Sequence, residues 1–394
     1  MKRRIAVVTS SRADYSHLYW VLAELMKQPD VEVAIIAMGS HMSAEFGSTW
    51  TNITNDGFAI TENIECLLSS DSDIGMAKTI GVATLGLADC LGKLRPDLLL
   101  LIADRYEMLA PACVALALRI PVAHIEGGDV SMGAIDDAAR NALTKLSHIH
   151  LTTTESSRKR VISMGEEPWR VYTVGSPSLD HITKATLLTR QEVEQRLQIS
   201  LDQRTLAVIY HPVTIAQDTL LEVDELLAAL EEAPQRLLFL SPNADAGSRE
   251  LMDRIHAFIQ TKRNSAFITN IEHLTYLSLL QYLAAIVGNS SSGIMEAASF
   301  KLPAVNVGLR QKGRERGNNV LDCRAHRAEI ETAIQIALSR SFRASLQNLS
   351  NPYGDGHSAE RIARILTSVP LAEPLLVKEP APIGAIEEYA YSSR

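Results

Sequence analysis

Four carboxylates lie in the stretch "HIEGGDVSMGAIDD", residues 124–137, which directly follows an apolar segment. They are Glu126, Asp129, Asp136 and Asp137. Glutamate is a poor turn former, so a tight turn does not explain Glu126. Asp136 and Asp137 begin a helical pattern, where acidic side chains suit the helix dipole. We expect this stretch to supply carboxylates that exchange protons with a bound molecule.

Other polar side chains follow apolar runs in the same way. Asp104 and Arg105 come directly after the apolar residues 97–103, where Asp104 could also serve as an ordinary helix cap. Arg140 is one helical turn beyond Asp136, the spacing of an ion pair. His211 ends an apolar run in "YHPVT"; such a histidine is more often structural than catalytic.

Two stretches have the composition of phosphate-binding turns. "VGNSSSGIMEAASF" (287–300) has more hydroxyls than a helix cap needs, so Ser290 and Ser291 are candidates for a diphosphate and Glu296 for ribose hydroxyls. "TSSRADYSHL" (9–18) combines a helix start with Arg12, although a capped helix with Arg12 in solvent is an equal alternative. The chain has neither GxGxxG nor a Walker A loop, which argues against nicotinamide and P-loop chemistry.

Short apolar runs alternate with helical patterns along most of the chain. This rhythm predicts βαβ units around parallel sheets. The expected helices in the first half include 15–27, 106–118 and 136–146. The expected strands are 4–10, 31–38, 97–103, 120–125 and 148–154, then 205–211, 236–241, 265–269, 284–288 and 303–308.

The rhythm is interrupted at residues 175–190, "GSPSLDHITKATLLTR", which we interpret as a domain boundary. The predicted fold class is therefore α/β, with two Rossmann-like doubly wound domains facing across a cleft. The first domain, 1–178, carries the acid/base residues, and the second, 179–357, the phosphate-binding turn. Parallel sheets bind ligands at the carboxyl ends of their strands. Residues 370–394 are proline-rich and are expected to form an extended tail.

Composition excludes several classes of protein. The net charge of −8 argues against a general nucleic-acid or membrane-surface binder. Four scattered cysteines without a CxxC motif predict reduced thiols and a cytoplasmic location. His148 and His150 share one face of a strand, but no third metal ligand is evident. We find neither a signal peptide nor an apolar run of spanning length, and expect a soluble protein.

These motifs in this order resemble the hydrolysing UDP-N-acetylglucosamine 2-epimerases of sialic and other nonulosonic acid synthesis. The resemblance covers about residues 3–368. It rests on "TSSRADYSHL", "DRYEMLAPA", "HIEGGDVSMGAIDDAAR", "TKLSHIH", "HPVT", "NADAGSRE", "VGNSSSGIMEA", "VNVGLRQKGRERGNNV" and "PYGDGHSAERI". It implies the glycosyltransferase B fold, a C-terminal helix at 358–369 packed back on the first domain, and a homodimer or homotetramer.

The resemblance also assigns roles to residues of this chain, and it implies neither a metal nor a cofactor. The implied catalytic residues are Asp104, Glu126, Asp136 and His211. The implied substrate-binding residues are Arg12, Ser16, Arg105, Arg140, Asn243, Arg249, Ser290, Ser291, Glu296 and Arg310.

The implied reaction converts UDP-N-acetylglucosamine and water to UDP and free N-acetylmannosamine. UDP leaves by elimination to give a glycal, and water then adds across the double bond. We expect Glu126 and Asp104 to transfer protons at C2, and Asp136 to act in hydration with Arg140 as its partner. We expect the serine-rich turn, Arg12 and His211 to neutralise the leaving diphosphate. Mutual repulsion and partial burial let carboxylates act as acid and base together.

The sequence departs from the family at two positions. Ala103 replaces a frequent glycine, and Asn141 replaces a frequent histidine, which could reflect a different sugar. A UDP-2,4-diacetamido-2,4,6-trideoxyhexose used for legionaminic-type acids is therefore a second possible substrate. The sequence also leaves open a non-hydrolysing epimerase, a glycosyltransferase of the same fold and an inactive nucleotide-sugar sensor.

Overall fold

The chain divides into two units that are each described separately. The computed structural model describes residues 2–68, 72–131, 135–202, 204–213, 221–242, 247–269, 271–371 and 373–379. The first unit takes in the chain up to Asp129, Asp136–Asp180 and the chain from Tyr353 onward. The second takes in Val130–Ile135 and His181–Pro352. The chain thus leaves the first unit after Asp180, two residues beyond the predicted boundary, and returns to it at Tyr353.

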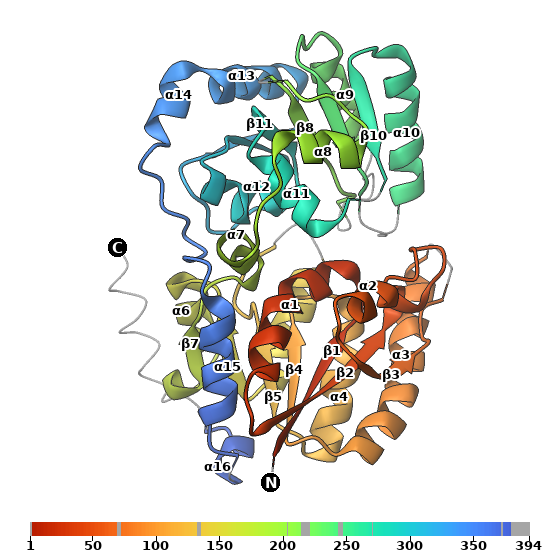
Figure 1. Ribbon diagram of the computed structural model, residues 1–394, viewed down its shortest axis with the longest axis vertical. Coiled ribbons are helices and arrows are strands. Elements are labelled where there is room, and N and C mark those ends of the chain that lie inside the picture. The colour runs from red at the N-terminus through yellow and green to blue at the C-terminus, as the bar shows by residue number, and fades with distance from the viewer. Residues whose placement is uncertain are drawn as a thin grey trace. The chain divides into compact units, whose positions relative to one another are not determined.

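The first unit is built on a seven-stranded parallel sheet with the order β3-β2-β1-β4-β5-β6-β7 (Figure 1). Its strands are β1 (Arg3–Thr9), β2 (Val31–Met38), β3 (Ile60–Ile64), β4 (Leu98–Ile102), β5 (Val122–Ile125), β6 (Ile149–Thr152) and β7 (Val171–Thr173). The sequence predicts five of them. It misses β3 and β7, the two edge strands, because "ITENI" is half polar and β7 has three residues.

Helices cover both faces of this sheet, as parallel connections require. The helices of the first unit are α1 (Arg12–Met26), α2 (Trp50–Asn55), α3 (Asp73–Leu94), α4 (Leu109–Leu118), α5 (Asp136–Leu146), α6 (Glu155–Ser163), α15 (Ser358–Ser368) and α16 (Glu373–Leu376). Helix α7 (Asp180–Lys184) begins at the last residue before the chain passes to the second unit. Short 3₁₀ turns are η1 (Gly39–Met42), η2 (Tyr106–Met108), η3 (Pro168–Arg170) and η4 (Pro177–Leu179).

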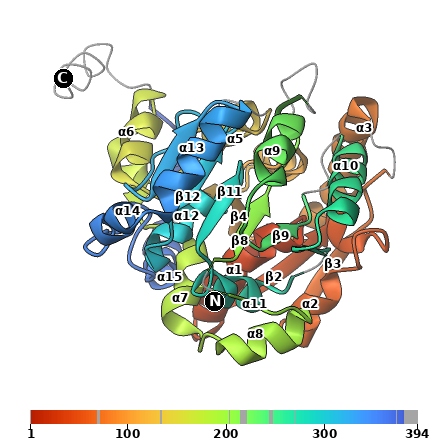
Figure 2. The same cartoon turned by 90° about the horizontal axis from the view of Figure 1, so that it is seen from above.

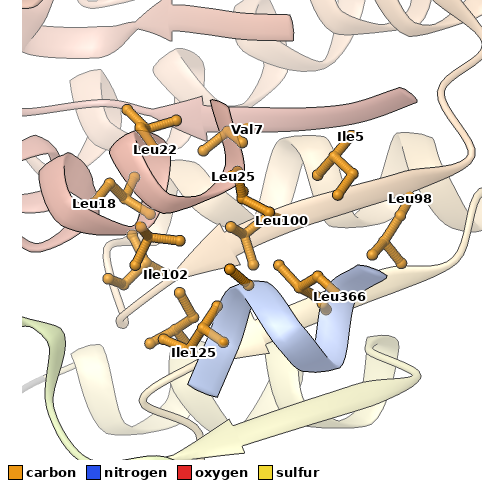
Figure 3. Close-up of a cluster of buried hydrophobic side chains, with 14 of the residues drawn as sticks. Ile5, Val7, Leu18, Leu22, Leu25, Leu98, Leu100, Ile102, Ile125 and Leu366 are labelled. Atoms are coloured by element: carbon orange, nitrogen blue, oxygen red, sulfur yellow. The ribbon is translucent and has the colours of Figure 1, made fainter. Parts of the chain in front are cut away.

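Alternate side chains of the central strands supply the two halves of the core. Ile5 and Val7 of β1 face α1 and α15, where they pack with Leu22 and Leu366 (Figure 3). Ala6 and Val8 belong to the opposite cluster, with residues of α3 and α4. Helix α15, from the end of the chain, therefore completes the core of the first unit.

Helix α3 contradicts the expectation that no segment reaches spanning length. It has 22 residues, and an 18-residue window of it has a mean hydropathy of 1.4, with 33% of that window buried. By length and composition it could cross a membrane. This is weak evidence, because core helices of soluble proteins pass the same test, and α3 packs along α4.

The second unit has a six-stranded parallel sheet with the order β10-β9-β8-β11-β12-β13, the Rossmann order. Figure 2 shows its helices around the sheet. The strands are β8 (Leu206–Ile209), β9 (Leu237–Leu240), β10 (Ser265–Ile268), β11 (Ala285–Gly288), β12 (Ala304–Val307) and β13 (Val320–Cys323). The sequence does not predict β13, which lies at the edge of the sheet. The helical segments are α8 (Arg190–Leu197), α9 (Leu221–Glu231), α10 (Ser248–Thr261), α11 (His273–Leu280), α12 (Ser292–Met295), η5 (Ala297–Phe300), α13 (Arg327–Leu338) and α14 (Arg340–Ser345). The predicted class, two doubly wound parallel-sheet α/β domains, is confirmed.

Asp180 fixes the N-terminus of α15. Its carboxylate is fully buried and accepts hydrogen bonds from the backbone N–H groups of Ser358 and Ala359, both at 2.8 Å. A Cβ on Gly175, whose φ is 91°, would lie 2.7 Å from the Ser358 hydroxyl. The returning chain therefore lies against the residues at which the first unit ends.

The described part of the C-terminal tail is bound to the first unit and is not simply extended. Helix α16 lies within it, and the buried Arg170 donates to the carbonyls of Leu375, at 2.7 Å, and Val377. Lys378 donates to the carbonyl of Ser147 at 2.9 Å and pairs with Glu166 at 2.7 Å. The rest of the predicted tail, residues 380–394, lies outside the described residues.

Several buried histidines of the first unit are held in the neutral form. Burial lowers the pKa of His41, His124 and His148 to about 4. His124 lies in β5, and its Nε2 is 2.7 Å from the carbonyl of Ala103; neutral imidazole can donate this bond.

Replacing Asp180 by alanine should lower the stability of the protein substantially. The variant leaves two buried N–H groups of α15 without their carboxylate, a loss of about 3 kcal/mol. The thermal midpoint measures the effect. A matched control is Thr189→Ala, which removes the cap of the exposed helix α8 and should cost about 1 kcal/mol. Equal shifts in the two variants would contradict the role of Asp180.

Acid should destabilise the protein through its buried histidines. Their pKa rises from about 4 in the folded chain to about 6.5 on unfolding, so the unfolded state binds more protons in this window. Their contribution is complete above pH 6.5 and is lost as the pH falls toward 4. Thermal midpoints measured across this window should decline. His148→Asn keeps an acceptor for the Val122 N–H and should flatten the decline, whereas His256→Asn, at an exposed histidine, should not.

Candidate functional site

Adjacent strands β4 and β5 of the first unit both end in a left-handed residue that is not glycine. Ala103 has φ 63° and Glu126 has φ 68°. Their N–H groups still bond the neighbouring strands, Ala103 to the Ile125 carbonyl and Glu126 to the Leu151 carbonyl, both at 3.0 Å. Such conformations cost roughly 1–2 kcal/mol. The left-handed turn also explains why glycine suits position 103.

Glu126 is a buried carboxylate with polar partners from distant parts of the chain. The residue is 7% exposed. Its Oε1 lies 2.9 Å from Nδ1 of His17 on α1 and accepts a hydrogen bond from the hydroxyl of Ser176 at 3.5 Å. These partners come from α1 and from the segment before η4, so tertiary structure holds the carboxylate.

Asp104 and Arg140 form an ion pair beside this strand end. Arg140 is 2% exposed, lies on α5, and also donates to the backbone carbonyl of Asp129 at 2.9 Å and to Asp137 at 3.4 Å. The structure thus shows Asp104 as a partner of Arg140, and the pairing of Arg140 with Asp136 stays a prediction. Asp136 is half-buried and is the first residue of α5; its part in the site stays a prediction.

Asp129 has a structural explanation. Its buried carboxylate accepts hydrogen bonds from the hydroxyls of Thr153, at 2.5 Å, and Ser157, at 2.6 Å. A Cβ on Gly128, whose φ is 81°, would lie 2.3 Å from the Ser157 carbonyl. Asp129 therefore holds the glycine loop against the start of α6.

The turn after β1 is organised by an acid of its own. Asp14 accepts hydrogen bonds from the hydroxyls of Ser10 and Ser11, at 2.7 and 2.9 Å, so these serines are already engaged. Arg12 begins α1, and burial lowers the pKa of its guanidinium. Ser16, one turn along, donates to the Ala13 carbonyl at 2.7 Å. A partly buried guanidinium at a helix start suits an anion.

Arg105 is held by an acidic neighbour. Its guanidinium donates to Oε1 of Glu107 at 2.9 and 3.2 Å, and Glu107 is fully buried. This contact fixes the turn between Asp104 and α4. The substrate-binding role of Arg105 stays a prediction.

In the second unit, the ends of β8 and β11 are tied together around His211. The side-chain oxygen of the buried Asn289 accepts from the His211 N–H at 2.7 Å, and its amide donates to the His211 carbonyl at 2.8 Å. Gly288 makes this approach possible, because a Cβ there would lie 2.0 Å from the Ile209 carbonyl. Burial, and then the charge of Arg310, lowers the pKa of His211 well below its usual value, so it is neutral at pH 7.

The serine-rich stretch follows directly. Ser290 and Ser291 are half-buried and precede α12. The sequence places Glu296 on the same helix, but α12 ends at Met295, and Glu296 lies at its junction with η5. Glu296 is 6% exposed. Its charge adds to burial in raising the pKa of Tyr276, whose hydroxyl contacts Ser292.

The remaining predicted residues lie at three places. Arg310 donates to the Asn289 carbonyl at 3.2 Å, as does Gln311 at 3.0 Å, so Arg310 belongs to the same cluster as His211. Arg249 is exposed on the first turn of α10. Asn243 lies outside the described residues.

Sequence reasoning misses residues whose partners lie far away along the chain. His17 lies inside "TSSRADYSHL", yet nothing local marks it, since Glu126 is 109 positions away. Asn289 stands between a strand and the serines, and only the ladder β8–β11 brings it to His211. Within the described ranges, no group of three or more His, Cys, Asp or Glu residues is arranged to hold a metal ion.

The sequence is similar to that of known proteins over most of its length. Residues 23–367 match the family described as UDP-N-acetylglucosamine 2-epimerase. The chain is 36% identical over 379 residues to the UDP-N,N'-diacetylbacillosamine 2-epimerase (hydrolyzing) of Legionella pneumophila, covering 96% of this chain and 99% of that one. It is 35% identical to the GDP/UDP-N,N'-diacetylbacillosamine 2-epimerase (hydrolyzing) of Campylobacter jejuni, covering 87% and 89%. It is 30% identical to the UDP-N-acetylglucosamine 2-epimerase of Neisseria meningitidis, covering 93% and 95%.

Solved structures agree in fold. The UDP-N-acetylglucosamine 2-epimerase from Neisseria meningitidis, solved with UDP-N-acetylglucosamine bound, matches with a TM-score of 0.80 and 18% identity, over 93% of this chain and 100% of that one. The predicted glycosyltransferase B-type fold is confirmed. With a family match across most of the chain and near full-length relatives above 30% identity, this protein belongs to the family of hydrolysing UDP-N-acetylglucosamine 2-epimerases.

Proposed function

We propose that this protein is a hydrolysing 2-epimerase that converts a UDP-linked 2-acetamido sugar and water to UDP and the free sugar inverted at C2. The observation that carries the proposal is Glu126, a buried carboxylate presented by a left-handed residue at a strand end. Beside it, Asp104 follows Ala103 at the end of β4 and is paired with Arg140. The free sugar would serve nonulosonic acid synthesis.

The reaction needs a base at C2 and an acid that returns a proton from the other face. The C2 hydrogen is not acidic, so cleavage of the C1–O bond must lead, with UDP as leaving group. Glu126 and Asp104 are proposed for the proton transfers and Asp136 for hydration. The pairing of Asp104 with Arg140 suits a carboxylate that starts ionised and accepts the proton.

The second unit is proposed to hold the nucleotide. Ser290, Ser291 and Arg310 offer hydroxyls and a guanidinium for a diphosphate, and the buried Glu296 offers a carboxylate for the ribose hydroxyls. His211 is neutral and can therefore donate one hydrogen bond to the leaving group without carrying a charge.

Two sugars compete as the substrate. The sequence favours UDP-N-acetylglucosamine. The relatives named for UDP-diacetylbacillosamine are 36% and 35% identical to this chain, against 30% for the relative from Neisseria meningitidis named for UDP-N-acetylglucosamine. We therefore put the 2,4-diacetamido-2,4,6-trideoxy sugar first and N-acetylglucosamine second.

We also propose a cytoplasmic homo-oligomer. Four free cysteines support a reducing location. Apolar side chains are exposed on α3 and α4, with Ile74 at 63%, Leu85 at 74% and Leu116 at 57%, and a second copy of the chain would cover them. Sedimentation of the purified protein measures its state of association.

Incubation with each sugar nucleotide tests the function directly. Without any acceptor, the protein should release UDP and a free manno-configured sugar, faster from the diacetamido substrate than from UDP-N-acetylglucosamine. In deuterated water the product should carry deuterium at C2, because the proton there comes from solvent after elimination. Retention of UDP on the epimerised sugar would indicate a non-hydrolysing enzyme, and a product without deuterium would exclude the elimination route.

Neutralising single carboxylates tests their roles. Glu126→Gln and Asp136→Asn should each lower kcat by about 10²-fold or more, because a positioned acid or base is lost while the shape is kept. The matched control is Asp137→Asn, on the same turn of α5, which should retain activity within a few-fold. If Glu126→Gln and Asp136→Asn also retain it, the carboxylate assignment is wrong.

A further inference from the structure

His17 approaches Glu126 from a different part of the first unit. Helix α1 presents the imidazole so that Nδ1 lies 2.9 Å from Oε1 of Glu126. The His17 side chain is 22% exposed and that of Glu126 is 10% exposed. The imidazole therefore connects a nearly buried carboxylate with the outside of the core.

Packing of α1 does not explain this contact. The buried residues of α1 include Leu18, Leu22 and Leu25, which lie in the hydrophobic core, whereas the side chain of His17 is 22% exposed. A single histidine–carboxylate pair with partial access to solvent adds little to the stability of the fold. The position of His17 is thus better accounted for by what it does to Glu126 than by folding.

Other described groups near Glu126 differ from His17 in charge or in burial. Ser176, before η4, contributes a neutral hydroxyl, which is also 3.1 Å from the hydroxyl of Ser178. His124, on β5 itself, is fully buried and neutral, and donates to the Ala103 carbonyl. At the end of the adjacent strand, Asp104 and Arg140 neutralise each other.

We propose that His17 is a positioning residue for Glu126 that also carries the C2 proton between this carboxylate and water. The inference deepens the proposed function and rests on it. In the elimination step the C2–H bond breaks, its electron pair forms the C1=C2 bond, and the C1–O pair leaves with UDP. The proton passes to Asp104, the carboxylate paired with Arg140. In the hydration step the Nδ1–H of His17 gives its proton to Oε1 of Glu126 while Nε2 takes one from water. Glu126 then gives its proton to C2, as Asp136 takes a proton from the water that adds to C1.

Three variants separate positioning from proton transfer. His17→Ala removes both functions and should lower kcat by about 10- to 100-fold, with KM changed less than about three-fold. His17→Asn can place an amide N–H near the position of Nδ1, so it should keep the orientation of Glu126 but lose the titrating group. His256→Asn, at an exposed histidine on α10, is the matched control and should behave as wild type.

The readouts are those that a purely structural role would not move. The pH profile of kcat in the wild type should show an inflection in the range where imidazole titrates, about pH 5 to 8, and His17→Asn should lose it. Added imidazole should restore part of the activity of His17→Ala but not that of Glu126→Gln. In the Glu126→Gln background, the His17→Ala change should have no further effect, since the two act through one proton.

Each result decides the inference. Unchanged thermal midpoints and unchanged affinity for UDP would show that the variants are folded. An active wild type whose His17 variants keep its pH profile, or cannot be rescued by imidazole, would overturn the role of His17 alone. A wild type that releases no UDP from either sugar nucleotide would overturn the proposed function, and this inference with it.

Discussion

The left-handed backbone at the ends of β4 and β5 is the constraint that positions the strand-end carboxylates of the first unit. A parallel ladder would otherwise carry each strand straight on, but Ala103 and Glu126 turn the chain out of the sheet while their N–H groups still bond the next strand. The neutral His124 accompanies this turn by bonding the Ala103 carbonyl. Asp104 and Glu126 thus leave neighbouring strands at fixed positions, and the rigid sheet sets their spacing.

The carboxylates at these turns are paired with groups from other elements of the fold. Glu126 meets His17 from α1, and Asp104 meets Arg140 from α5. A buried ion pair contributes little net stability, because desolvation offsets most of the attraction. The left-handed residues add a further cost. The buried ion pair and the left-handed residues thus place costly geometry at one edge of the sheet, where the proposed chemistry requires ordered charges. Helix α15, held at its start by Asp180, helps complete the core of the same unit.

The sequence predicts most of the sheet but only part of the site. Central strands such as β4 are continuous apolar runs, which length and composition identify. Strands β3, β7 and β13 lie at sheet edges, where polar or short strands give no such signal. Local spacing suggests Asp136 as a partner of Arg140, and the structure adds Asp104 from the end of another strand, which local spacing could not show. His17 shows the same limit: its type is visible in the sequence, but its partner comes through tertiary structure.

The strand ends of the second unit carry neutral and positive groups, whereas those of the first unit carry carboxylates. Gly288 has φ 138°. Next to it, the side chain of Asn289 accepts from the His211 N–H, and the carbonyl of Asn289 accepts from Arg310. In the proposed reaction the diphosphate develops negative charge while a base removes a proton from C2. The first unit has carboxylates at its strand ends, and the second unit has amide, hydroxyl and guanidinium groups at its own. The sheets share a strand order, so the division of labour arises from the residues that follow each strand and not from the fold.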